Sequence, residues 1–553
     1  MLRRLTETDD GNDFLREGPG VMRRKIAAAG LAAGLFIGGG TVAAAQDGPA
    51  FPCLNPPTLD STVPSDSPIT DQNSLNCFAW QEFIALNWKA DGIDAPAGPD
   101  PVANFGAPDD TGPTVWETYS DIHSVFLPDG SPPPPFGELP PAPAACAEIY
   151  TPGTRVLTRS SKVSIDFEAP DDIAEAFPFD GSPNWLADRD GNQVWYEIMI
   201  NRDEFDYIVA NRLYNAVEGY LATLGGQEVD LPRGRTGGAV GAIELKSAWV
   251  EVPDPAQPVW STYKLTEALI HDPAHGSCET ATLALVGLHI IHKTESQPQW
   301  IWSTFEHVAN APDAAAVSAG DVGNEFRFFN PSCASQAIPA QCVGNSVARP
   351  DGTLFCDASK VGSPTETSCT PNASPGFCVT PDCPPMPVQV AREHAIADGQ
   401  DNLVASLNAA AQSMIRAAAP DSVFANYMLV DVLWSDSPVD ENTPNRAPST
   451  APLSISGMRP APTERPVANT TMETYIQGTT CISCHMGAKL AWPSQNDALT
   501  PFASDYSFSF QNALPIPAGE CEERRTWAPQ PHLTSRAAAF LPGLRPLPLP
   551  PAC

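Results

Sequence analysis

The sequence is poor in basic residues. It contains 31 lysines and arginines against 65 aspartates and glutamates, which gives a formal net charge of −34 over 553 residues. So acidic a chain repels the phosphate backbone of nucleic acids, and nucleic acid is therefore excluded as a plausible partner. Binding to anionic membranes is disfavoured for the same reason.

Long apolar runs are scarce as well. The run at 26–42 is interrupted by glycines and is too short for a stable membrane span. It follows the basic residues 23–25 and precedes three alanines, an order typical of a secretory signal peptide. We therefore expect a true start at Met22, cleavage after Ala45, and a periplasmic or secreted mature chain without a transmembrane segment.

Several catalytic signatures are also missing. The chain has no phosphate-binding loop, no nucleophile elbow and no HExxH motif. It is rich in proline, with 60 residues, which are too many for a bundle of long helices. The length nevertheless allows one large core or two to three ordinary ones.

Hydrophobic periodicity indicates an α+β fold. Alternating or continuous apolar residues between about 154 and 310 predict several strands with loop-rich connections, and hence a strand-rich antiparallel body that is sandwich-like or barrel-like. The expected strands are 194–200, 243–249, 283–291, 300–308 and 423–434. The expected helices are one from Thr70 or Asp71 to Trp88, then 115–126, 203–221 and 401–418, and a short one that begins at Asn469 or Thr470.

The cysteine content suggests disulfides. Two of the 14 cysteines belong to the motif described next, which leaves twelve, an even number in a chain with an export signal. We expect up to six disulfides formed in an oxidising compartment. Six of the twelve lie between Cys333 and Cys383, where a disulfide-bearing insert fits better than a domain with its own core. The sequence does not fix their connectivity.

The strongest motif is Cys481-Ile482-Ser483-Cys484-His485. Two thiols on one helical turn can both add to the two vinyl groups along one edge of a porphyrin, and the next residue then places an imidazole under the iron. A disulfide, a redox-active CxxC or half of a zinc site are the alternatives. A thioredoxin-type site stands early in a βαβ unit, and a zinc site needs a second ligand pair that no suitable spacing supplies.

The segment around this motif resembles the haem-binding motif of c-type cytochromes, and the larger body looks like that of exported bacterial proteins of the cytochrome c family. The resemblance implies one covalent haem c, with thioether bonds to Cys481 and Cys484 and with His485 as the proximal iron ligand. The match to the haem-binding motif covers only the residues around Cys481–His485. The small cytochromes usually supply a methionine downstream as the sixth ligand, whereas Met486 is the last methionine of this chain.

The sixth ligand is therefore expected upstream, unless the site is open. His289 and His292 are three apart on a predicted strand and face opposite sides, so at most one of them could face a haem. His289 and His307 are the candidates for the distal position, although a histidine in an apolar run is more often a hydrogen-bonded core residue.

Three functions remain open at this point. The first is a periplasmic mono-haem cytochrome that transfers electrons; the second is a haem-dependent redox enzyme, peroxidase-like or oxygenase-like, with an open distal side; the third is a binding protein with a structural or sensory haem. The partner is a redox protein or a small-molecule substrate, and the catalytic residues are unknown.

The expected segments are 1–45 as an upstream extension and signal peptide, 46–330 as the body, 331–390 as the insert, 391–465 as the rest of the body, 466–523 as the haem c segment and 524–553 as a proline-rich tail.

Overall fold

The computed structural model describes much of the chain between residues 51 and 515. The described residues are 51–68, 71–92, 97–108, 110–139, 141–151, 153–158, 185–272, 276–338, 345–348, 354–357, 366–373, 385–438, 457–461, 465–491, 500 and 502–515. By its contacts the chain divides into two units, 1–47 and 48–553. The first unit, with the expected signal peptide, lies outside the described residues, as does the tail at 524–553.

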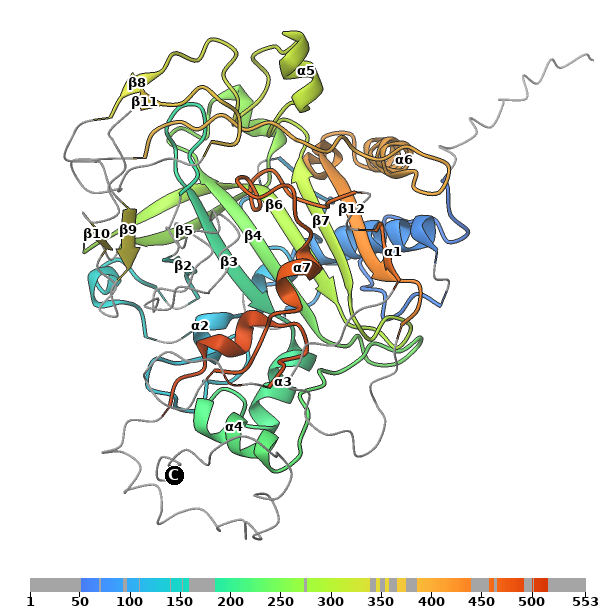
Figure 1. Ribbon diagram of the computed structural model, residues 1–553, viewed down its shortest axis with the longest axis vertical. Coiled ribbons are helices and arrows are strands. Elements are labelled where there is room, and N and C mark those ends of the chain that lie inside the picture. Colours follow the sequence, from blue (N-terminus) through green and yellow to red (C-terminus); the bar gives the residue numbers. More distant parts are fainter. Residues whose placement is uncertain are drawn as a thin grey trace, which may run out of the picture. The chain divides into compact units, whose positions relative to one another are not determined.

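The body is built on one nine-stranded sheet (Figure 1). Its main path runs β1-β3-β4-β6-β7-β12-β13, and β5 pairs with β6 on one side and β2 on the other. The described pairs are antiparallel except β2 with β5. The strands are β1 (Ser120–Asp121), β2 (Val156–Leu157), β3 (Val194–Ile200), β4 (Ile243–Glu251), β5 (Leu265–Asp272), β6 (Ser277–His292), β7 (Ile301–His307), β12 (Tyr427–Ser435) and β13 (Met458–Arg459).

One face of this sheet is apolar and is covered by helices α1 (Gln72–Leu86) and α6 (Val404–Ala418). Helix α1 begins where predicted, because the side chain of Asp71 accepts a hydrogen bond from the Ser74 amide at 3.0 Å and satisfies an otherwise unpaired helix donor. Its buried side chains form the main hydrophobic core together with the strands.

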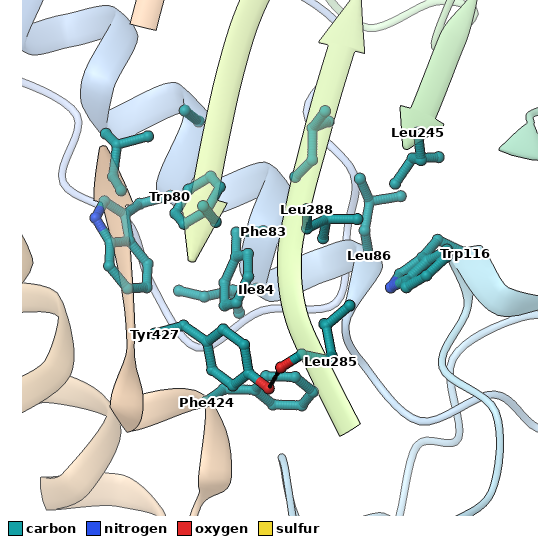
Figure 2. Packing of buried hydrophobic residues seen from close by; sticks show 14 of the residues in the cluster. Trp80, Phe83, Ile84, Leu86, Trp116, Leu245, Leu285, Leu288, Phe424 and Tyr427 are labelled. Atoms are coloured by element: carbon teal, nitrogen blue, oxygen red, sulfur yellow. Dashed lines mark hydrogen bonds between the residues drawn. The ribbon is translucent and has the colours of Figure 1, made fainter. Parts of the chain in front are cut away.

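Aromatic rings fill the space between α1 and the sheet. Figure 2 shows Phe83 and Ile84 packed close to Leu285 and Leu288 of β6. The hydroxyl of Tyr427 donates to the Leu285 carbonyl at 2.8 Å, so the one polar atom of that ring is also satisfied. This packing explains why β4, β6 and β7 are buried along most of their lengths.

The α+β class and the antiparallel, strand-rich body expected from the sequence are confirmed. The nine strands belong to one sheet, and helices cover its apolar face. The predicted helix at 401–418 and the strands at 194–200, 243–249, 283–291 and 300–308 are found with small shifts of their ends.

Three predicted elements of the body differ from the structure. The helix expected at 203–221 is two helices, α3 (Arg202–Ala210) and α4 (Ala216–Leu224), because Asn215 caps a new helix by accepting from the amides of Val217 and Glu218. The helix expected at 115–126 is a 3-10 turn, strand β1 and the single turn α2 (Ile122–Val125). The strand expected at 423–434 opens with a 3-10 turn and becomes extended only from Tyr427.

The expected insert contains two small hairpin-like pairs and a disulfide. Strands β8 (Gln336–Ala337) and β11 (Glu366–Thr367) pair with each other, as do β9 (Asn345–Ala348) and β10 (Leu354–Asp357), and α5 (Ala314–Ala319) precedes them. The bond Cys333–Cys369 closes this region.

Two further disulfides, Cys53–Cys77 and Cys146–Cys278, join parts of the body. Within the described residues, no helix is both long enough and apolar enough to cross a membrane.

Candidate functional site

The second face of the sheet is lined with polar residues that are nevertheless buried. They are Glu244 and Lys246 on β4, His289 on β6, and Thr304 and Glu306 on β7, and we call them the polar row. The strand register pairs Lys246 with His289 and His289 with Thr304, and directly paired residues point to the same side of a sheet. Such a row is stable only if other groups satisfy its hydrogen bonds.

Arg392 pairs with Glu306, and the other partners described below come from the C-terminal part of the chain. We call residues 465–491 the strap and residues 502–515 the cap loop. Figure 1 shows α7 (Cys481–His485), the helix of the strap, in front of β4 and β6, and the contact between Lys246 and His485 shows that the strap lies against this face.

The first half of the strap is fixed to β7 by side chains. Asn469 Nδ2 donates to Thr304 Oγ1 at 3.0 Å and to the Phe305 carbonyl at 2.8 Å. Thr470 donates to Glu306 Oε2 from its amide at 2.9 Å and from its hydroxyl at 2.6 Å. The helix expected from Asn469 or Thr470 is not formed: Asn469 Oδ1 accepts from the Thr471 amide at 2.9 Å, as a cap would, but residues 470–479 form turns and α7 begins only at Cys481.

A second attachment joins the strap to β6. Glu473 Oε2 accepts from the Asn469 amide at 2.7 Å, and Glu473 Oε1 lies 3.0 Å from His289 Nε2. Both side chains are buried. Glu473 thus connects the turn of the strap to the polar row.

The motif begins directly after these turns. Helix α7 spans Cys481–His485, so the two thiols are three residues apart on one turn. Cys484 is buried and Cys481 is half-buried, and neither belongs to any of the three disulfides described above. Ser483, between them, is exposed.

His485 is oriented by the cap loop. Its Nδ1 lies 2.7 Å from the carbonyl oxygen of Tyr506. Because a carbonyl oxygen only accepts hydrogen bonds, Nδ1 carries the proton and Nε2 carries the lone pair of the neutral ring. The rings of Trp302 and Phe508 flank the imidazole, with centroids at 4.7 and 4.8 Å.

Lys246 stands opposite the other ring nitrogen. Its Nζ lies 3.3 Å from His485 Nε2, and both residues are buried. Burial lowers the pKa of Lys246, and the nearby carboxylates Glu244 and Glu473 oppose this effect.

The cap loop is held by buried acids. Ser507 and Ser509 both donate to Glu244 Oε1, the second at 3.3 Å. Glu204, a buried residue of α3, lies beside Glu244. Its burial is the larger cause, and the charge of Glu244 the smaller, that raise the pKa of Glu204 well above its ordinary value. Asp505 accepts from the Leu231 amide at 2.7 Å and pairs with Lys293, and burial raises the pKa of Asp505 to about 7.

The two distal candidates end on opposite faces. His289 belongs to the polar row, where it is paired directly with Lys246 of β4. His307 is on the other face, where its ring stacks on Tyr263 with centroids 3.6 Å apart. The alternation of β7 explains this, because Trp302 faces His485 and residues at odd numbers face away from it. The structure therefore brings His289, and not His307, to the face that carries the motif.

Sequence reasoning missed Lys246, Glu473 and the Tyr506 carbonyl. A lysine in the apolar strand 243–249 was a usable signal, because a charged residue at a buried strand position needs a partner. The carbonyl has no sequence signal at all, since every residue carries one.

In the described part of the chain, no three or more His, Cys, Asp and Glu side chains are grouped so as to hold a metal ion. Comparison of the chain with models of protein families, with curated proteins and with solved structures finds no match.

Proposed function

We propose that this chain carries one haem c, attached through Cys481 and Cys484 with His485 as the proximal ligand, and that it transfers electrons as an exported redox protein. The observation that carries the proposal is the hydrogen bond from His485 Nδ1 to the Tyr506 carbonyl, on a histidine that directly follows two cysteines of one helical turn. A carbonyl that accepts from Nδ1 fixes the tautomer of a metal-binding histidine and directs Nε2 to the metal.

The donor set fits this group. The porphyrin supplies four nitrogen ligands, so a single imidazole from the protein suffices on the proximal side. The half-buried Cys481 and the buried Cys484 would hold one porphyrin edge, and Trp302 and Phe508 would keep the imidazole from rotating. When bound, the haem supplies one-electron exchange between its ferric and ferrous states.

Each contact around His485 has a distinct task in this proposal. The Tyr506 carbonyl raises the basicity of the imidazole and fixes the direction of Nε2, and the buried surroundings exclude water from the metal side of the ring. The partly exposed Cys481 would leave one edge of the porphyrin near the surface, where a partner protein can exchange electrons.

The three described disulfides support export, because such bonds persist in oxidising compartments. We therefore extend the proposal to a periplasmic or secreted location, after removal of the segment that ends at Ala45.

The test is production of the full chain in a bacterial host that exports proteins and attaches haem c. We expect haem that stays with the polypeptide on a denaturing gel, together with the absorption spectrum of a c-type ferrous haem in pyridine. Cys481→Ala with Cys484→Ala should abolish both signals. Ser483→Ala, on the exposed position between the cysteines, is the matched control and should keep them. Folded, exported protein without covalent haem would refute the proposal.

A further inference from the structure

We infer that Lys246 supplies the iron ligand opposite His485, so that the haem is six-coordinate with one imidazole and one amine. The inference rests on the proposed function, since it concerns the second axial position of the same haem. The juxtaposition that carries it is Lys246 Nζ at 3.3 Å from His485 Nε2, in the buried space between β4 and α7.

The direction of the contact matters more than its length. Because Nδ1 of His485 is occupied by the Tyr506 carbonyl, the nitrogen that remains for a metal is Nε2, and this is the atom that faces the lysine. An imidazole–metal bond is about 2.0–2.1 Å long, so two nitrogen ligands on opposite sides of one ion stand about 4 Å apart. The observed 3.3 Å is shorter than this, so the lysine has to withdraw by about 1 Å for an iron to lie between the two nitrogens, and the side chains around them have to part to admit the plane of the porphyrin.

Lys246 has the freedom that this withdrawal requires. Its backbone is fixed, because β4 lies between β3 and β6 and Lys246 is paired with Ile198 on one side and His289 on the other. Its side chain is a four-carbon stem with rotatable bonds, which can withdraw along its own length while the strand stays in place.

The other side chains of this face that could bind an iron, His289 and Met472, make contacts elsewhere. His289 Nε2 lies 3.0 Å from Glu473, whose other oxygen holds the Asn469 amide, so turning His289 toward the motif would loosen the attachment of the strap. Met472 packs over Gly287 in a separate hydrophobic cluster with strands β3 and β4. For Lys246, a contact with the metal-side nitrogen of His485 is observed directly.

The test uses the purified holoprotein and its Lys246→Ala variant. For the wild-type protein we expect a low-spin ferric spectrum and no binding of carbon monoxide to the ferrous form on rapid mixing. Lys246→Ala should convert the ferric spectrum to high spin and gain complete carbon monoxide binding. Lys264→Ala, which removes another buried lysine remote from the motif, should keep the wild-type spectrum and controls for general loosening of the body.

A second variant guards against misfolding of the first. Lys246→Met replaces the amine by a thioether on a side chain of similar length, and we expect it to bind haem and to change the ferric absorption to that of an imidazole–thioether iron. Haem-loaded variants with spectra identical to the wild type would refute the role of Lys246 and leave the proposed function standing. Rapid carbon monoxide binding by the wild-type protein would also refute it, because the position would then be open. Complete absence of covalent haem from the wild-type protein would instead refute the proposed function itself.

Discussion

His307 is a histidine packed as a neutral aromatic ring. It stacks on Tyr263 at 3.6 Å between centroids and meets the ring of Tyr427 edge-on at 5.1 Å. Its Nε2 donates to the Thr262 carbonyl at 3.0 Å, and its Nδ1 accepts from the Ala309 amide at 3.2 Å. Burial lowers the pKa of His307 to about 3, so the ring stays uncharged in the folded protein under ordinary conditions.

This residue predicts a pH dependence of stability. The unfolded chain takes up a proton on His307 near pH 6.5, whereas the folded protein resists it down to about pH 3. Between these values the unfolded state binds more protons, so the contribution of His307 is full above about pH 6.5 and falls by up to about 1.4 kcal/mol for each pH unit below it.

The measurement is the free energy of unfolding of the wild-type protein and of His307→Phe between pH 4 and 8. The difference between the two proteins should shrink as the pH falls, because the variant cannot bind this proton. Parallel pH profiles would contradict the assignment of His307 as a neutral buried ring.

At the scale of elements, the strap depends on one small residue of the sheet. A Cβ added to Gly287 of β6 would lie 2.4 Å from Thr471 Oγ1 and 3.0 Å from Asn469 Oδ1. The first of these separations is shorter than real contacts allow, and the atoms belong to the turn that Glu473 and Thr304 hold in place. Gly287 therefore lets the strap approach the strand closely.

We expect Gly287→Ala to lower the free energy of unfolding by about 1–3 kcal/mol, as overpacking of a well-packed interior usually does. In the holoprotein it should also reduce the amount of bound haem. Gly478→Ala is the matched control in the same strap, because a Cβ there would meet nothing within 4 Å. Denaturant unfolding of both variants checks the prediction, and equal stabilities would show that the strap tolerates displacement.

The elements that sequence patterns predicted well are those with local causes. Helix α1 has its cap at Asp71, β4 alternates apolar and polar residues from Ile243 to Lys246, and the second half of β6 is a nearly continuous apolar run. The break between α3 and α4 was missed because Asn215 competes for amides that an unbroken helix would have used. The expected helix at Asn469 did not form although Asn469 Oδ1 accepts from the Thr471 amide as a cap would, because Asn469 Nδ2 and the Thr470 hydroxyl hold the chain to β7, some 165 residues earlier.

The residues of the candidate site also divide into those that local sequence identifies and those that only the fold brings together. Spacing alone identifies Cys481, Cys484 and His485, because these three residues are adjacent in the chain. Lys246 meets His485 across 239 residues of sequence, and only the register of β4, β6 and β7 together with the course of the strap determines that contact. Alternation placed His289 and His292 on opposite faces, as found, but it could not say which face the motif would cover.

At the scale of the whole molecule, disulfides tie distant parts of the body together. Cys146–Cys278 closes a loop of 132 residues, whereas Cys53–Cys77 closes one of 24. The even number of cysteines predicted bonds of this kind, although it did not give their connectivity. The remaining cysteines outside the motif, Cys342, Cys356, Cys378, Cys383, Cys521 and Cys553, have no described side chains.

Loop closure predicts unequal effects for these two bonds. Removal of Cys146–Cys278 by a double serine substitution should destabilise the protein by about 5 kcal/mol, and removal of Cys53–Cys77 by about 3.5 kcal/mol, because the longer loop restricts the unfolded chain more. Unfolding of each variant by denaturant under non-reducing conditions measures the two losses. A larger effect for the shorter loop would show that local packing of Cys77 in α1 outweighs chain entropy.

The polar row also bears on the order in which the chain assembles. The side of the sheet under α1 is apolar and must be covered for the body to be stable, whereas Glu244, Lys246 and His289 on the other side can remain hydrated until the strap and the cap loop dock. The strap comes late in the chain and its described contacts reach back to strands made earlier, so its docking can be the last step of folding. Until then its two thiols would stay accessible on an extended segment, which is the state in which a bulky planar group can be joined to them before the strap closes over the sheet.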